Sequence, residues 1–297
     1  KMAMLFCLAG FTFSCAIKER AVNSAADLFS NAQAVYLSDA DPELVGAALP
    51  FNLKTMEVLL ESYPEHRGLL LSATTSFILY SFGYVEAEAD FVQDYYLSED
   101  LRARASRLYR RAMGYGLRGL EVTHAGITKE LTQDPESAVA RLTKDDVACA
   151  VWTAAAWGAA ISTAKDDPEM TADIAVVGAI LHRALELDET FADGFIHELL
   201  MSYELGRFGG SFDQAKIHYK RALELSRGKK VSLWLNWATQ ACVPAQDQTQ
   251  FRAMLNKVIE FDLDDAPSNR LLNTLAQRKA LWLKERADEM FLEGGNP

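Results

Sequence analysis

The chain has 297 residues, of which 49% are hydrophobic and 24% are charged, and its formal net charge is −11 at pH 7. A chain of this length and composition can bury a substantial core, which excludes a mainly disordered protein. The acidic balance excludes nucleic acid as the main partner, because binding to phosphates requires a basic surface.

The chain begins with an apolar segment that is typical of a secretion signal. Lys1 precedes an uncharged run over residues 2–13, and a small residue, Ser14, stands directly before Cys15. A run of about twelve apolar residues is too short to span a bilayer and fits the core of a signal peptide. We therefore predict a lipoprotein signal peptide over residues 1–14, with Cys15 lipidated and anchoring the mature chain to a membrane. A cleaved signal that leaves Cys15 unmodified and an internal helix are the alternatives.

From residue 23 onward, apolar residues recur with helical spacing, and runs that alternate as in β-strands are absent from the sequence. Proline and glycine mark the expected helix boundaries, and proline after aspartate suits the first turn of a helix. These boundaries are Asp41–Pro42, Pro50, Tyr63–Pro64, Asp134–Pro135, Asp167–Pro168, Gly209–Gly210, Val243–Pro244 and Ala266–Pro267. No segment has the composition of a long linker, so we expect a single all-α domain over residues 15–297.

Internal repeats indicate how the helices are organised. The hexapeptide over residues 183–188 recurs over residues 221–226, and a looser copy follows over residues 257–262. Two segments have the small–aromatic–small spacing of the second helix of a tetratricopeptide repeat, in which small residues let paired helices approach closely. They contain Ala105, Tyr109 and Ala112, and Ala215, Tyr219 and Ala222. We predict an all-α, superhelical stack of degenerate tetratricopeptide-like helical hairpins.

The sequence motifs of enzymes are missing from the chain. His197 and Glu198 begin like the zinc-binding motif H-E-x-x-H, but Met201 stands where the second histidine belongs. The other histidines have no second ligand at a metal-binding spacing, and neither G-x-S-x-G nor a phosphate-binding glycine loop occurs. We predict no enzymatic activity, no metal site and no cofactor.

Residues 152–160 combine two tryptophans with small side chains, mostly alanine. Small residues on one face of a helix let a neighbouring helix pack tightly, or leave a hollow that the indoles line. Tight packing and an apolar ligand cavity with a few polar groups are both open interpretations. The candidate cavity residues are Trp152, Trp157, Lys165, His197, Glu198 and Asn236.

An ordered series of segments over nearly the whole chain resembles the T-component family of TRAP transporters, the tripartite ATP-independent periplasmic transporters. After the lipoprotein signal, the segments that carry this resemblance are Leu37–Val45, Ala48–Lys54 with Glu57, Leu69–Ala73, Tyr109–Ala112, Tyr115–Arg118, Trp152–Ala160, Lys165–Pro168, Arg183–Leu185, Gly194–Glu198, Ala215–Tyr219, Arg270–Asn273 and Trp282–Leu283.

This resemblance implies a periplasmic lipoprotein with a tetratricopeptide-like fold that forms a homotrimer. It also implies a pore or cavity in each protomer, a hydrophobic small-molecule ligand, and binding to the extracytoplasmic substrate-binding subunit of the transporter. A generic tetratricopeptide scaffold for envelope protein assembly, with no small-molecule ligand, is the alternative.

Overall fold

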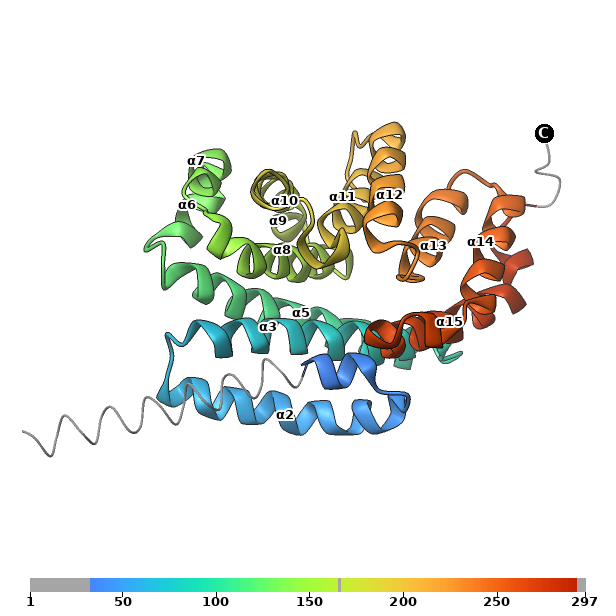
Figure 1. Ribbon diagram of the computed structural model, residues 1–297, viewed down its shortest axis with the longest axis horizontal. Coiled ribbons are helices and arrows are strands. Elements are labelled where there is room, and N and C mark those ends of the chain that lie inside the picture. Colours follow the sequence, from blue (N-terminus) through green and yellow to red (C-terminus); the bar gives the residue numbers. More distant parts are fainter. Residues whose placement is uncertain (1–32, 165–166, 293–297) are drawn as a thin grey trace, which may run out of the picture.

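The computed structural model describes residues 33–164 and 167–292, and it folds them into helices joined by short connections (Figure 1). These residues contain no β-strand, so the predicted all-α class is confirmed for them. The predictions that concern Cys15 and Lys165 fall outside the described residues.

The first long helix shows where the predicted boundaries hold and where they fail. α2 (Pro42–Ser62) begins as expected, because the Asp41 side chain accepts a hydrogen bond from the Leu44 backbone N–H at 2.9 Å. The expected break at Pro50 is wrong, since α2 continues through this residue. Apolar side chains are buried before and after Pro50, and their burial outweighs the loss of one backbone hydrogen bond.

Consecutive helices then pack against one another in chain order. α2 packs on α3, α3 on α5, and α5 on α8, while α6 and α7 form a small hairpin beside them. The elements of this half are α3 (Arg67–Tyr80), the π-helical turn η1 (Ser81–Glu86), α4 (Ala87–Phe91), α5 (Tyr95–Glu121), α6 (Ile127–Gln133), α7 (Pro135–Ala140) and α8 (Val147–Ser162).

The second half continues the same order, with α8 against α10, α10 against α11 and α11 against α12. Its elements are α9 (Pro168–Ala172), α10 (Ile174–Leu187), α11 (Phe195–Gly206), α12 (Phe212–Ser226), α13 (Ser232–Trp237), the π-helical turn η4 (Ala238–Cys242), α14 (Gln248–Glu260) and α15 (Arg270–Glu285). The boundaries predicted at Asp134–Pro135, Asp167–Pro168 and Gly209–Gly210 are confirmed.

The last helix returns to the first part of the chain. α15 contacts α2, and Figure 1 shows α15 (red) beside the blue and cyan helices. Leu271 of α15 belongs to a small buried cluster with Val45, Leu49 and Leu79. The two ends of the described chain are therefore joined by apolar packing.

The helical run Arg67–Phe91 is long and apolar enough to cross a membrane, by length and composition alone. Inside the protein, 67% of its most apolar window is buried, as is usual for a helix in the core. Its burial against α2, α5 and α8 accounts for its apolar composition.

Candidate functional site

The two predicted tryptophans lie on different sides of α8. The half-buried Trp152 ring packs against Phe195 of α11, with 4.8 Å between the ring centroids. Trp157 is fully buried, and its Nε1–H donates a hydrogen bond to Asp173 at 3.2 Å. Residues five apart on an α-helix point in directions about 140° apart, so one hollow cannot be lined equally by both indoles.

Glu198 and Asn236, two of the residues named for the predicted cavity, are hydrogen-bonded to each other. The Asn236 Nδ2–H donates to Glu198 Oε1 at 3.1 Å, which joins α11 to α13. Burial raises the pKa of Glu198, although Lys230, Ser232 and Asn236 act in the opposite direction. The site therefore contains a carboxyl group that its surroundings push toward the neutral form.

Lys230 completes this cluster and was not predicted from the sequence. Its ammonium lies 5.5 Å from the centroid of the Phe195 ring and donates to the backbone oxygen of Ala192. Burial lowers the pKa of Lys230, against the raising effect of Glu198. Phe195 and Glu198 are three residues apart on α11, and this spacing is the signal that could have placed Phe195 in the site. The approach of Trp152 and Lys230 depends on tertiary packing.

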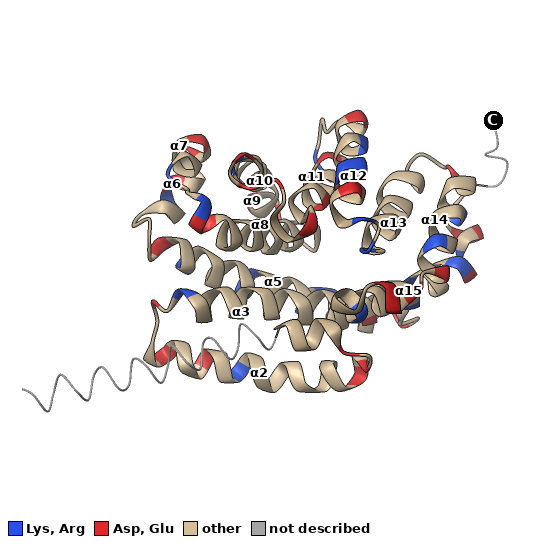
Figure 2. Ribbon diagram, in the orientation of Figure 1, with Lys and Arg blue, Asp and Glu red and all other residues tan. Residues whose placement is uncertain are grey.

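We name Trp152, Phe195, Glu198, Lys230 and Asn236 the α8–α13 cluster. It combines partly exposed aromatic faces with one carboxyl group, one amine and one amide. Neither α8 nor α13 carries a charged residue, and both ribbons are uniformly tan in Figure 2. The ionisable groups of the cluster, Glu198 and Lys230, thus lie beside two helices that carry no charged residue, an arrangement suited to an apolar molecule with a polar end.

His197 does not join this cluster. Its ring nitrogens lie 2.8 Å from His218 Nδ1 and 3.2 Å from Glu189 Oε1, on another side of α11. His197 follows Phe195 by two residues, and side chains at that spacing do not share a helix face.

A cavity of about 350 Å³ lies elsewhere, between α2 and α5. None of the predicted site residues lines it. Its walls are mostly polar, and its lining includes Lys54, Glu57, Arg111, Tyr115 and Arg118. The Glu57 carboxylate accepts hydrogen bonds from Lys54 Nζ and from the Tyr115 hydroxyl, both at 2.6 Å, and forms an ion pair with Arg111. The structure itself thus supplies the anion that these donors bind.

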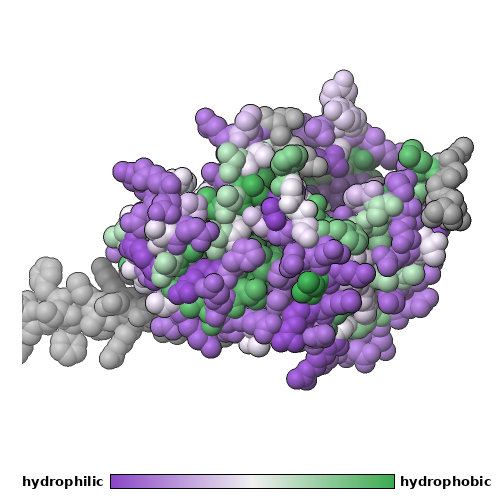
Figure 3. All heavy atoms as spheres, turned by 90° about the horizontal axis from the view of Figure 1, so that it is seen from above, coloured by the Kyte–Doolittle hydropathy of each residue, from purple (hydrophilic) through white to green (hydrophobic). Residues whose placement is uncertain are grey.

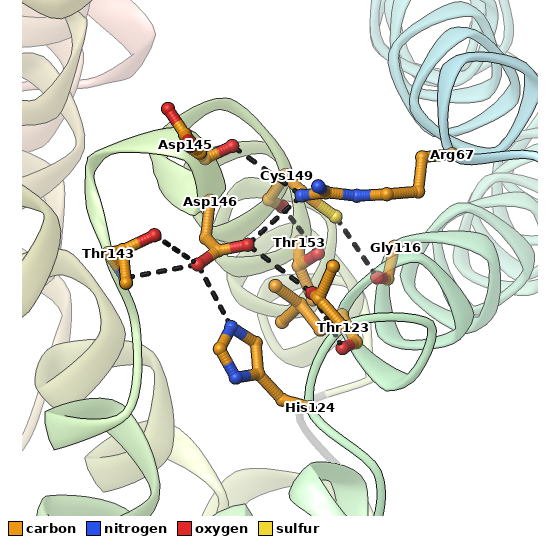
Figure 4. Close-up of polar contacts among 10 residues, drawn as sticks. Arg67, Gly116, Thr123, His124, Thr143, Asp145, Asp146, Cys149 and Thr153 are labelled. Carbon is orange, nitrogen blue, oxygen red and sulfur yellow. Dashed lines mark hydrogen bonds and ion pairs between the residues drawn. The ribbon is translucent and has the colours of Figure 1, made fainter.

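Asp146 forms a second polar centre that sequence reasoning missed (Figure 4). Its side chain is buried and accepts hydrogen bonds from Arg67 at 3.0 Å, from Thr143 Oγ1 at 2.8 Å and from His124 Nε2 at 2.9 Å. Burial would raise the pKa of Asp146, but hydrogen bonds from His124 and Thr143 outweigh it and hold this pKa below its usual value. Asp146 therefore ties α3 and the end of α5 to the start of α8.

Cys149 lies in the same view and is not a nucleophile in this state. Burial raises the pKa of its thiol to about 11, and Sγ lies 3.4 Å from the backbone oxygen of Gly116. A thiol, in contrast to a thiolate, reacts poorly. Among residues 33–164 and 167–292, no group of three or more His, Cys, Asp or Glu side chains is placed to hold a metal ion.

Comparison with known proteins identifies the family. An uncharacterized protein of Treponema pallidum (strain Nichols) is 25% identical to this chain over 268 residues, which span 87% of this chain and 83% of the relative. Residues 38–291 match the family described as TRAP transporter T-component, and this range includes the α8–α13 cluster and Asp146. With most of its length inside that match, the chain belongs to the TRAP transporter T-component family.

Proposed function

We propose that this protein is a periplasmic lipoprotein, anchored through Cys15, that assists a TRAP transporter. In this proposal it binds the extracytoplasmic substrate-binding subunit and a hydrophobic ligand. The observation that carries the proposal is the family match over residues 38–291, whose description names a transporter component and not a catalyst. We also propose that the helices form a tetratricopeptide-like superhelical stack, because consecutive helices pack in chain order.

The α8–α13 cluster supports the ligand-binding part of the proposal. The half-buried rings of Trp152 and Phe195 offer apolar contact, and Lys230 and Glu198 stand beside them with polar atoms. Ligand sites in proteins commonly pair an apolar wall with a few placed polar groups. We propose that the apolar body of the ligand contacts the rings and that its polar end meets Lys230.

The outer face of α2 supports binding to other proteins. Leu44, Phe51 and Val58 are well exposed, and their spacing of seven residues places them on one face of the helix. On the opposite side of the molecule from α2, seen from above, apolar patches also interrupt a mostly hydrophilic surface (Figure 3). Exposed apolar patches often mark protein interfaces. We propose that the α2 face joins protomers in the homotrimer.

The partner is tested by sedimentation velocity with the purified protein and the cognate substrate-binding subunit. The proposal expects a faster-sedimenting complex, and the absence of such a complex at high protein concentration would contradict the partner assignment.

Phe51→Glu on the α2 face should dissociate the homotrimer, because it places a charge in the proposed apolar contact between protomers. Phe208→Glu is the control, since Phe208 is fully exposed on the turn between α11 and α12.

The ligand is tested by native mass spectrometry of gently extracted protein. We expect an apolar molecule to co-purify with the wild type and to be lost from Trp152→Ala and Phe195→Ala. Trp282→Ala on α15 is the control, because it removes an indole outside the α8–α13 cluster.

The burial of Trp157 favours the alternative function, a tetratricopeptide scaffold that binds no small molecule. That alternative predicts protein without any bound ligand.

The anchor is tested by metabolic labelling with a palmitate analogue and by detergent phase partition. The wild type and Cys7→Ala should be labelled if Cys7 belongs to the cleaved signal peptide and Cys15 is lipidated. Cys15→Ala should remain unlabelled and enter the aqueous phase. Labelling of Cys15→Ala would disprove the assignment of the lipid to this residue.

A further inference from the structure

A buried histidine, His197, and a half-buried histidine, His218, face each other between α11 and α12. His197 Nδ1 and His218 Nδ1 are 2.8 Å apart, a hydrogen-bonding distance, and the ring centroids are 5.1 Å apart. His197 is only 5% exposed, and His218 is half-buried. α12 packs mainly against α11, so this pair lies within the contact that holds α12 in place.

The neighbouring carboxylate determines which nitrogen carries each proton. Arg221 is the main cause that lowers the pKa of Glu189 to about 2, so the Glu189 carboxylate can only accept hydrogen bonds. Its Oε1 lies 3.2 Å from His197 Nε2, which must therefore carry a hydrogen. A neutral His197 then has a lone pair on Nδ1, and His218 must donate to it from its own Nδ1–H.

This hydrogen-bonded chain tolerates one added proton but not two. A proton on His218 Nε2 leaves the bond from His218 Nδ1–H to His197 intact. A second added proton must occupy His197 Nδ1, so that two N–H groups point at each other. The Nδ1–Nδ1 distance of 2.8 Å leaves room for only one hydrogen between the two atoms. Repulsion between two imidazolium rings adds to this conflict.

We propose that the His197–His218 pair is a proton-operated latch between α11 and α12. It is closed while the neutral pair has gained at most one added proton, and it opens when both rings are charged. The proposal concerns mobility of α12 and does not depend on the ligand or partner proposed above.

The surroundings of the pair favour the neutral state. Burial, then His197 and His182, lowers the pKa of His218 to about 4, against the raising effect of Glu204. Burial also lowers the pKa of His197, aided by Arg221 and opposed by Glu189. These groups face the pair from α10, α11, α12 and the segment between α10 and α11.

The direction of the pH effect follows from these lowered values. A histidine released from the contact titrates near its ordinary pKa of about 6.5, so the open state takes up protons more readily than the closed one. The latch is therefore fully closed above about pH 6.5 and weakens as the pH falls toward the lower pKa values of the closed state.

Two measurements on the wild-type protein test the latch directly. Long-range ¹H–¹⁵N NMR at neutral pH should show His218 protonated at Nδ1, the tautomer that is less common in free histidine. Hydrogen exchange, corrected for its intrinsic pH dependence, should accelerate in α12 by at least about tenfold between about pH 7 and about pH 5, relative to α2.

A pair of variants separates the latch from general acid sensitivity. In His218→Gln the side-chain amide can still donate to His197 but cannot become charged, so the acid-dependent exchange of α12 should be reduced to the part that His197 alone contributes. His182→Gln removes an exposed histidine outside the pair. It should retain that dependence in slightly weaker form, because His182 only adds to the effect of burial on the pKa of His218. Observation of His218 protonated at Nε2 alone at neutral pH, or equal pH dependence of α12 and α2 in the wild type, would overturn the proposal even if both variants failed to fold.

Discussion

Lys279 on α15 places its ammonium 2.8 Å from the carboxylate of Asp90 on α4, and this ion pair joins residues 189 positions apart. Arg102 of α5 binds the same carboxylate at 3.2 Å. Beside them, the rings of Phe91 and Trp282 meet edge to face, with 5.7 Å between their centroids. Asp90 is therefore a shared acceptor where the last helix closes against the first half of the chain.

Asp90→Ala should weaken this closure. The substitution leaves Arg102 and Lys279 without their shared carboxylate, and both side chains are partly buried. We expect the free energy of unfolding to fall by about 1–2 kcal/mol, measured by urea denaturation. Glu43→Ala is the control, because it removes the exposed ion pair with Arg278 between α2 and α15. An equal or greater loss in Glu43→Ala would contradict the role given to Asp90.

Gly114 and Gly116 on α5 should respond in opposite directions to alanine. A Cβ on Gly116 would lie 2.2 Å from Thr153 Oγ1 and 3.2 Å from the Thr153 Cα of α8. The Thr153 hydroxyl donates to Cys149 O at 2.6 Å, which restricts its ability to move aside. We expect Gly116→Ala to lower the free energy of unfolding by about 2 kcal/mol.

At Gly114, a Cβ would meet nothing within 4 Å. Gly114→Ala should therefore stabilise the protein by about 0.5–1 kcal/mol, since alanine favours the helix more than glycine does. Thermal denaturation of both variants checks the pair, and stabilisation by both would show that α5 and α8 do not approach as closely as described.

Much of the helical fold could be predicted from the sequence because its boundaries are local. Aspartate before proline caps α2, α7 and α9, and these caps depend only on neighbouring residues. Pro50 was misjudged because its effect depends on the apolar contacts on both sides of it, which are tertiary. The return of α15 to α2 also had no local signal, since it joins distant segments.

The candidate site was predicted only in part for the same reason. Glu198 and Asn236 were named together and are hydrogen-bonded, whereas Trp157 and His197 point to other neighbours. Lys230 was missed because it lies in a connection between helices, where periodicity gives no direction. Asp146 was missed because its partners come from three separate segments of the chain.

Asp146→Asn should strongly destabilise the protein at neutral pH. The buried carboxylate holds Arg67, His124 and Thr143 together, and an amide cannot accept all of their hydrogen bonds. We expect a loss of about 3 kcal/mol in the free energy of unfolding. Asp145→Asn is the control, because Asp145 is exposed and contributes its backbone oxygen to Arg67.

The effect of Asp146→Asn should also depend on pH in a defined direction. Hydrogen bonds from His124 and Thr143 hold the pKa of Asp146 below its usual value, so its contribution is fully present above about pH 4, the unfolded value. It is lost as the pH falls through the lower pKa of the folded state. Denaturation curves of wild type and variant should therefore converge in strong acid, and a constant difference would show that the charge of Asp146 is unimportant.

Glu198→Gln should stabilise the protein, unlike most substitutions of buried residues. Burial raises the pKa of Glu198 in the folded state, so its ionised form lowers stability as the pH rises above about 4.3, the unfolded value. The glutamine carbonyl can still accept a hydrogen bond from Asn236. We expect the free energy of unfolding to rise by about 1 kcal/mol at pH near 8, and this gain should fade below about pH 4.

Glu204→Gln on the same helix is the matched control. There burial is outweighed by hydrogen bonds from Ser211 and Arg207 that lower the pKa of Glu204, so its substitution should destabilise. Urea denaturation across this pH range checks both variants. A destabilised Glu198→Gln would show that this carboxylate supports the fold, whereas a stabilised variant would indicate a residue retained for ligand binding at the expense of stability.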